Sequence, residues 1–253
     1  MVKYNMEFIN INNYKFIRYS LKDNINVVFS TSEGNLNFNK NISEGKSNLQ
    51  KIKEWFNVNE VIYLNQVHGT KVYDYQLNDK KCIIDLDGDG IVTNVQKCAV
   101  GVFTADCVPI ILVDETLKVI SALHSGWKGT INNIVKEGVE TMILKYGSKP
   151  ENIKAFIGPH NRECCYEVSE ELIESFKEKD LFKHSIINSG RMLSLSQCIK
   201  VELAKLNLKE KNIFDLNLCT YCSKEPNLYS YRKPEQSKGR LFSFVYISSN
   251  KDY

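Results

Sequence analysis

The chain contains many short apolar runs that are typical of buried β-strands. Strands of this kind are rich in Val, Ile, Leu and Phe, as in the run VPIILV at residues 108–113. The predicted strands cover residues 26–30, 61–67, 71–75, 90–93, 99–104, 110–113, 119–123, 154–157 and 241–247. Strands thus outnumber the predicted helices by about two to one.

Helical spacing of apolar residues is clearest over residues 130–146, with Thr130 as the predicted N-cap and Gly147 as the stop. A second helix is predicted to begin after Ser169, which acts as a cap and is followed by acidic residues in the first turn. Further helices are predicted over 47–56 and 195–206. Because strands and helices do not alternate strictly, we predict an α/β fold, a single domain spanning 1–253 with a mixed β-sheet and packed helices.

Three residues that can bind a metal each follow a strand-like run: His68, Cys107 and His124. If these strands are neighbours with a common direction, their carboxyl ends bring two imidazoles and a thiolate together. Two nitrogens and one sulfur are suitable zinc ligands, and three protein ligands leave the fourth position open for water or substrate. The pattern predicts an open zinc site of the catalytic type.

The segment 124–130 (HSGWKGT) joins a strand to the clearest helix and is a candidate anion site. Its glycines, including Gly129, allow close backbone approach, and a helix that begins at Thr130 would offer free N–H groups beside Lys128. The alternative is an ordinary strand–helix turn with Trp127 packed on the core. Arg232 is a further candidate for an anionic or stacked substrate, or else a surface residue.

Asp106 and Cys107 lie side by side at a strand end, and each allows more than one role. Cys107 is a metal thiolate, a nucleophile or an inert buried thiol. Asp106 is the candidate catalytic residue, which would manage protons, orient a ligand imidazole or merely hydrogen-bond the turn.

Two other motifs are predicted to have no metal-binding role. The acidic segment 85–90 (DLDGDG) resembles the start of a calcium loop, but Gln96 stands where such a loop needs Glu, so we expect this turn to serve the fold. The pair Cys219 and Cys222 has knuckle spacing, but the vicinal Cys164 and Cys165 have the wrong spacing to complete a site. Buried or weakly redox-active thiols are expected there.

Composition favours an ordinary globular protein, with 43% hydrophobic and 25% charged residues. The net charge of +3 and the scattered Lys residues do not favour nucleic-acid binding. The apolar runs are too short for a membrane span, and the N-terminus lacks the apolar region of a signal peptide. We therefore expect a cytoplasmic protein with no membrane contact, whose eight cysteines are reduced.

Several segments together resemble the laccase-domain or YfiH-like family, whose members are described as purine nucleoside phosphorylases. The matching segments are 65–70 (NQVHGT), 89–93 (DGIVT), 103–110 (FTADCVPI), 124–130 (HSGWKGT), 157–159 (IGP) with 165–168 (CYEV), and 229–232 (YSYR) followed by 239–240 (GR). They run in family order and cover nearly the whole chain. One departure is Ser32, which stands where the family usually has Arg in a longer loop.

The resemblance implies a YfiH-like α/β domain and a metal, Zn²⁺ with Cu²⁺ as the alternative, held by His68, Cys107 and His124. It implies phosphorolysis of adenosine, inosine and S-methyl-5′-thioadenosine, with adenosine deamination as a companion activity. The implied partners are a purine nucleoside and phosphate, and no particular protein partner is indicated.

Three other functions are alternatives to this one. A cysteine hydrolase or amidase, for example in cell-wall precursor editing, would use Cys107 as nucleophile with His124 or His68 as base. A true laccase is rejected, because a multicopper oxidase needs about ten histidines and the chain has four. A non-catalytic metal-binding module is disfavoured by the open ligand position.

Overall fold

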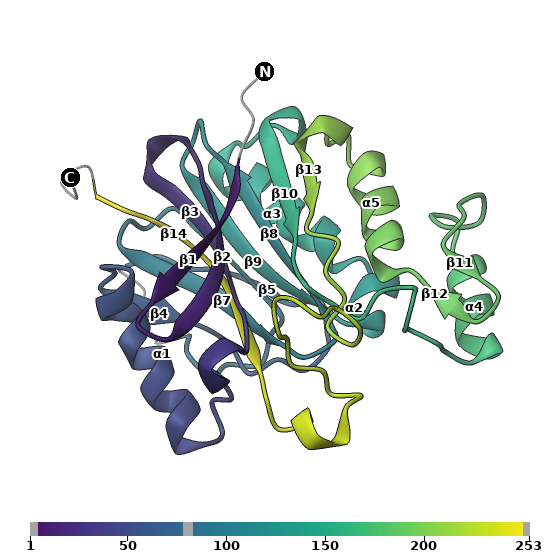
Figure 1. Cartoon of the computed structure of the whole chain (residues 1–253). Coiled ribbons are helices and arrows are strands. Elements are labelled where there is room, and N and C mark those ends of the chain that lie inside the picture. The colour runs from purple at the N-terminus through teal and green to yellow at the C-terminus, as the bar shows by residue number, and fades with distance from the viewer. Residues whose placement is uncertain (1–4, 78–82, 250–253) are drawn as a thin grey trace.

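Two six-stranded mixed sheets dominate the architecture (Figure 1). The computed structural model describes residues 5–77 and 83–249. The first sheet has the order β1 (Met6–Ile11), β2 (Tyr14–Ser20), β3 (Ile25–Ser30), β14 (Leu241–Ile247), β7 (Cys98–Thr104) and β4 (Glu60–Ile62). The second has the order β13 (Ile213–Asp215), β10 (Ile153–Ile157), β8 (Val108–Asp114), β9 (Val119–Ser125), β6 (Gly90–Thr93) and β5 (Val72–Asp74). A small hairpin pairs β11 (Asn188–Ser189) with β12 (Met192–Leu193).

The two sheets pack face to face, and helices cover their outer faces. Apolar side chains of β3, β7 and β14 meet those of β8, β9 and β6 in the core between the sheets. Helix α1 (Ser43–Trp55) covers the first sheet, whereas α3 (Ile134–Tyr146), α4 (Glu170–Lys177) and α5 (Leu195–Lys205) pack in the core of the second. Strands β7, β8, β9 and β14 are therefore buried on both faces, which explains their continuous apolar sequences.

The predicted fold class, an α/β domain with mixed sheet and packed helices, is confirmed, but there are two large sheets where the sequence suggested one. Each sheet contains both parallel and antiparallel pairs; β7, for example, is parallel to β4 and antiparallel to β14. The predicted strand at 61–67 ends at Ile62, and β1 and β2 were not predicted. The domain boundaries 1–253 stay a prediction.

The predicted helix over 130–146 is wrong at its start. The chain forms the short helix α2 (Trp127–Ile131), breaks at Asn133, whose φ of 63° is left-handed, and resumes as α3. Gly147 ends α3 with φ of 76°, as predicted for a glycine stop. The Ser169 cap is also confirmed, since its side chain accepts a hydrogen bond from the Leu172 N–H.

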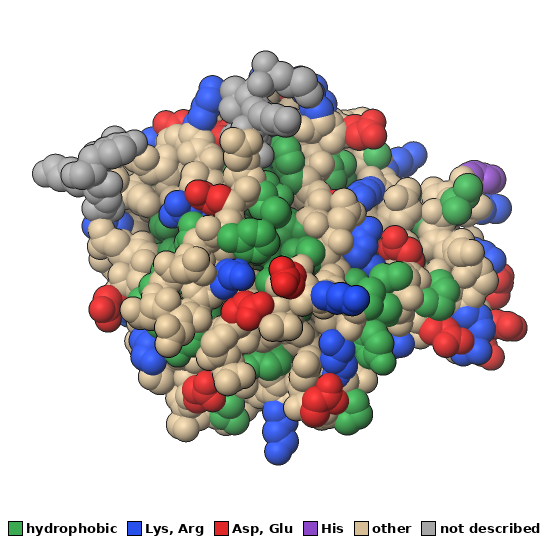
Figure 2. Space-filling model, in the orientation of Figure 1, with side chains coloured by type: hydrophobic (Ala, Val, Ile, Leu, Met, Phe, Trp, Pro, Cys, Tyr) green, Lys and Arg blue, Asp and Glu red, His purple; other side chains and the backbone are tan. Residues whose placement is uncertain are grey.

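On the face drawn in Figure 2, acidic and basic side chains are interspersed, and no patch of one charge stands out. Within residues 5–77 and 83–249, no helix is long and apolar enough to cross a membrane.

Candidate functional site

The three predicted metal ligands do meet. The ligand atoms of His68, Cys107 and His124 all lie within 4.8 Å of one another. The two imidazole rings stand edge to face, with centroids 4.8 Å apart. The convergence predicted from the strand ends is therefore confirmed, although the three strands do not belong to one sheet.

The crossing of the chain between the two sheets explains how these residues come together. Cys107 lies in the turn where β7 of the first sheet ends and β8 of the second begins. Strand β9 runs antiparallel to β8, and its His124 lies opposite Pro109, close to Cys107. The loop that carries His68 follows β4, which is parallel to β7, so it leaves the first sheet at the same end.

Asp89 holds the site in place, and it is a residue that sequence reasoning missed. The carboxylate is fully buried at the start of β6, and its Oδ1 lies 2.8 Å from Nδ1 of His124. The Asp89 carboxylate also accepts hydrogen bonds from the N–H groups of Val67, His68 and Gly69. Engaging Nδ1 leaves Nε2 of His124 available to a ligand, so Asp89 is placed as a carboxylate that would orient a metal-binding histidine.

The acidic segment 85–90 was expected to serve only the fold, and that expectation is wrong for Asp89. The sequence gives only an indirect signal, since Asp89 opens the segment 89–93 (DGIVT), one of those that resemble the family. The role itself depends on tertiary hydrogen bonds between segments far apart in sequence.

Gly126 is required by the close packing of the site. A Cβ atom at this position would lie 3.0 Å from Sγ of Cys107 and 3.1 Å from Cδ2 of His68. The backbone φ of −76° is ordinary, so the restriction is steric.

The electrostatics favour a charged Cys107. Burial raises the pKa of the thiol, but the imidazoles of His124 and His68 lower it more, and the net shift is downward. Burial lowers the pKa of His124, whereas Cys107 and Asp89 raise it, and the net shift is upward. The metal-free pair therefore resembles a thiolate beside an imidazolium, and the thiolate is the form that serves as a metal ligand or a nucleophile.

A cavity of about 510 Å³ opens onto these residues, within the range of about 300–1,000 Å³ typical of small-molecule sites. His68, Cys107 and His124 all line it. Three cationic side chains also line it, namely Lys40, Arg232 and Arg240. Lys40 was not singled out from the sequence, and Arg240 was named there only within the matching segment 239–240 (GR), with no role assigned to it.

Of the four predicted anion-binding residues, Arg232 lines this cavity, and Lys128, Gly129 and Thr130 are not among its described lining residues. The Thr130 N–H is already bonded to the Gly126 carbonyl at 2.9 Å, because α2 begins before it. Gly129 is buried, and the Lys128 ammonium lies 5.5 Å from the centroid of the Trp127 ring. The expected cradle at a helix start is therefore not formed at Thr130.

Asp106 lines the cavity with its carboxylate already engaged. Oδ1 accepts hydrogen bonds from the hydroxyls of Thr220 and Ser230, both at 2.7 Å. Oδ2 accepts from the Arg232 N–H at 3.0 Å. These contacts tie the C-terminal segment to the turn that carries Cys107, and the catalytic role predicted for Asp106 stays a prediction.

The fold and the family match place the chain in a laccase-like class of proteins. The family model described as "multi-copper polyphenol oxidoreductase laccase" matches residues 26–248, so the chain belongs to this family. The family's description names several coppers, whereas the chain has four histidines in all.

Named relatives and solved structures agree with this assignment. A purine nucleoside phosphorylase of Clostridium acetobutylicum is 41% identical over 240 residues, covering 95% of this chain and 99% of the relative. An adenosine deaminase, RL5, from an unknown prokaryotic organism is 29% identical over 200 residues, covering 75% of this chain and 76% of the relative. The crystal structure of the Bacillus licheniformis protein YfiH has a TM-score of 0.83 at 22% identity, covering 95% of this chain and 99% of that one, and it supports the fold.

Proposed function

We propose that the protein is a zinc-dependent purine nucleoside phosphorylase that acts on adenosine, inosine and S-methyl-5′-thioadenosine, with adenosine deaminase activity. The observation that carries the proposal is the meeting of two imidazoles and a thiolate at the wall of a cavity that three cationic side chains also line. The names of the relatives from Clostridium acetobutylicum and of RL5 support the reaction class.

The residues present fit a zinc ion. Three donor atoms within 4.8 Å of one another, with His124 oriented by Asp89, suit an open site of two nitrogens and one sulfur. Copper is the alternative, since imidazole and thiolate also suit that metal. A zinc ion held there would supply Lewis-acid chemistry, toward water in deamination or toward the departing base in phosphorolysis.

The cavity residues supply binding and orientation. Arg232 and Arg240 would hold phosphate, because guanidinium groups bind phosphate oxygens through paired N–H donors. Phe103 and Tyr231 also line the cavity and offer apolar ring surface for a purine. Asp106, next to Arg232, is the candidate for handling protons and for keeping that segment in position.

The alternative function is a cysteine hydrolase or amidase that acts, for example, on a cell-wall precursor. The lowered pKa of Cys107 beside His124 specifically favours it, because a thiolate next to an imidazole is an activated nucleophile. The two functions use the same residues and differ in whether Cys107 holds a metal or attacks the substrate.

Turnover of adenosine with and without phosphate tests the proposal. Ribose 1-phosphate should form only when phosphate is added, and inosine formation without phosphate would report deamination. Cys107→Ala should lose activity together with the zinc held by His68, Cys107 and His124, whereas Cys98→Ala, which removes a buried thiol of β7, should keep both. A Cys107→Ala protein with the same zinc content as wild type and no activity would instead favour the cysteine nucleophile.

A further inference from the structure

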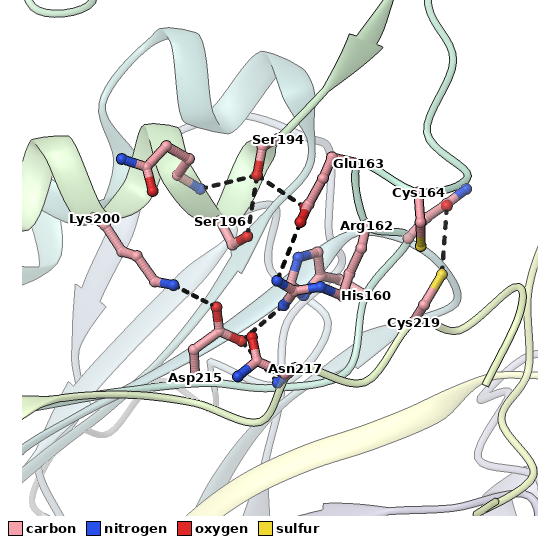
Figure 3. A network of polar contacts seen from close by, with 12 residues as sticks. His160, Arg162, Glu163, Cys164, Ser194, Ser196, Lys200, Asp215, Asn217 and Cys219 are labelled. Atoms are coloured by element: carbon pink, nitrogen blue, oxygen red, sulfur yellow. Dashed lines mark hydrogen bonds and ion pairs between the residues drawn. The ribbon is translucent and has the colours of Figure 1, made fainter. Parts of the chain in front are cut away.

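Four cysteines from two segments that are distant in sequence form a second group of possible metal ligands. Cys164 and Cys165 follow β10, and Cys219 and Cys222 follow β13. Their four sulfur atoms all lie within 4.8 Å of one another, and the Cys164 and Cys222 sulfurs are 3.5 Å apart. Figure 3 shows Cys164 and Cys219 facing each other. We call this group the four-cysteine cluster.

The vicinal pair was not expected to complete a site with the Cys-x-x-Cys pair, yet the fold brings the four sulfurs together. The number of residues between two cysteines matters most when both members of each pair lie in one tight turn. Here the parallel pairing of β10 with β13 aligns the two strands, and the segments that follow them leave at the same end. An additional bridge joins His160 to Cys219, which brings the second cysteine segment alongside the first.

The spacing of the sulfurs suits tetrahedral coordination. Zinc–sulfur bonds of about 2.3 Å in a tetrahedron place the sulfurs about 3.8 Å apart. Contacts that range up to 4.8 Å reach this geometry with small side-chain movements, and the Cys164–Cys222 distance of 3.5 Å is already close to it. All four cysteines are free thiols, so each sulfur is available to a metal.

The four thiols differ in their exposure to solvent. Cys219 is buried and Cys165 is half-buried, whereas Cys164 and Cys222 are exposed. A metal ion can therefore reach the cluster from solvent through its two exposed members.

We propose that the four-cysteine cluster binds a structural Zn²⁺, separate from the site of His68, Cys107 and His124. Binding would replace the thiol protons by four zinc–sulfur bonds and release those protons to solvent. Four protein ligands close the coordination shell, so the ion would not take part in a reaction.

The position of the cluster indicates what this zinc would stabilise. Thr220, next to Cys219, donates to the Asp106 carboxylate, and the Asn161 N–H donates to the Asp106 carbonyl at 2.8 Å. Each cysteine-bearing segment therefore holds the residue that precedes Cys107. A tetrathiolate zinc would lock both segments together and fix the wall of the cavity.

Zinc content of protein purified under reducing, oxygen-free conditions tests the proposal. Wild type should carry about two zinc ions per chain. The double variant Cys164→Ser/Cys222→Ser removes the two exposed thiols and should carry about one, and Cys198→Ala, which removes a buried thiol of α5, should keep about two. A double variant with the same zinc content as wild type would overturn the proposal.

Cobalt substitution identifies the ligands independently of enzyme activity. In Cys107→Ala, Co²⁺ bound by the four-cysteine cluster should give sulfur-to-cobalt charge-transfer bands, which the further change Cys164→Ser/Cys222→Ser should abolish. The absence of these bands in Cys107→Ala, or a Cys164–Cys222 disulfide in the reduced preparation, would also overturn it. Failure of nucleoside turnover would leave these measurements unaffected, so the two proposals are tested separately.

Discussion

The Nδ1 atom of His124 lies 2.8 Å from Oδ1 of Asp89, and both side chains are almost fully buried. The same carboxylate accepts the backbone N–H of His68 at 3.0 Å, so one residue orients the His124 ring and fixes the backbone that carries His68. Asp89→Asn should lower zinc affinity by about 10- to 100-fold, because an amide cannot replace every accepted hydrogen bond. Competition with a colour-forming chelator measures this affinity.

The control for this substitution is Asp87→Asn, which changes an exposed carboxylate two residues away that bonds Asn65 rather than a histidine. Its zinc affinity should match wild type. Equal affinities for Asp89→Asn and Asp87→Asn would show that the buried carboxylate does not position the metal ligands.

A second prediction concerns Gly126. Gly126→Ala places a methyl group 3.0 Å from the Cys107 sulfur, so the ligands must spread and zinc affinity should fall, by about tenfold or more. Gly147→Ala should behave in the opposite way: it keeps zinc affinity, but loses about 1–2 kcal/mol of unfolding free energy because its φ is +76°. Chelator competition and urea unfolding of both variants distinguish the two effects. Unchanged zinc affinity in Gly126→Ala would contradict the steric argument.

The strands that were predicted well are those whose apolar runs are buried on both faces, such as β7, β8 and β9. Strands β1 and β2 lie toward the edge of the first sheet with many exposed or half-buried positions, so their sequences lack a continuous apolar run. The start of the 130–146 helix was misplaced because Asn133 adopts a left-handed conformation that breaks it, a choice that apolar spacing does not report.

The meeting of His68, Cys107 and His124 was predictable because His and Cys at strand ends are informative residue types. Asp89 was not, because its role arises from hydrogen bonds to the His68 loop and to β9, which are distant in sequence. The four-cysteine cluster was dismissed for the same reason: the spacing within each pair says nothing about how β10 and β13 align the pairs.

A third prediction separates the cations of the cavity from those outside it. Arg232 lines the cavity, and the loss of a charged hydrogen-bond donor to phosphate costs about 1.5–3 kcal/mol. Arg232→Ala should therefore raise the KM for phosphate by about 10- to 100-fold. Lys128→Ala should leave it unchanged, since Lys128 is not among the described residues that line the cavity. Steady-state phosphorolysis at varied phosphate concentration measures the KM of both variants. A phosphate KM that is raised in Lys128→Ala and unchanged in Arg232→Ala would reverse the assignment.

A fourth prediction addresses the two roles open to Asp106. Asp106→Asn replaces one carboxylate oxygen by an NH2 group, which cannot accept a hydrogen bond. This group either faces the Arg232 N–H or weakens the hydrogen bonds from the hydroxyls of Thr220 and Ser230. If Asp106 transfers protons, kcat should fall by about 100-fold or more, and the pH profile should lose one limb. If it only positions Arg232, the phosphate KM should rise as in Arg232→Ala while the shape of the pH profile is kept. The kcat and KM values across pH measure the difference.

The last prediction concerns pH-dependent stability and a residue outside the site. Glu202 is buried in α5, where Oε1 accepts the Lys136 N–H at 2.8 Å and Oε2 has no hydrogen-bond partner among the described residues. Burial raises its pKa from 4.5 to about 8, against the opposing effect of Lys136. Between these two pKa values the folded state binds more protons than the unfolded state. Stability should therefore fall as pH rises through this window, by up to about 1.4 kcal/mol per pH unit.

Glu202→Gln removes the titration and keeps a neutral side chain of similar shape, so its stability relative to wild type should increase steadily from about pH 5 to about pH 8. Glu210→Gln, which changes an exposed glutamate, should follow wild type throughout. Urea unfolding across this range measures both variants. If the Glu202→Gln and wild-type curves stay parallel, Glu202 is already ionised in the folded protein, and a cation near Oε2 must then be sought.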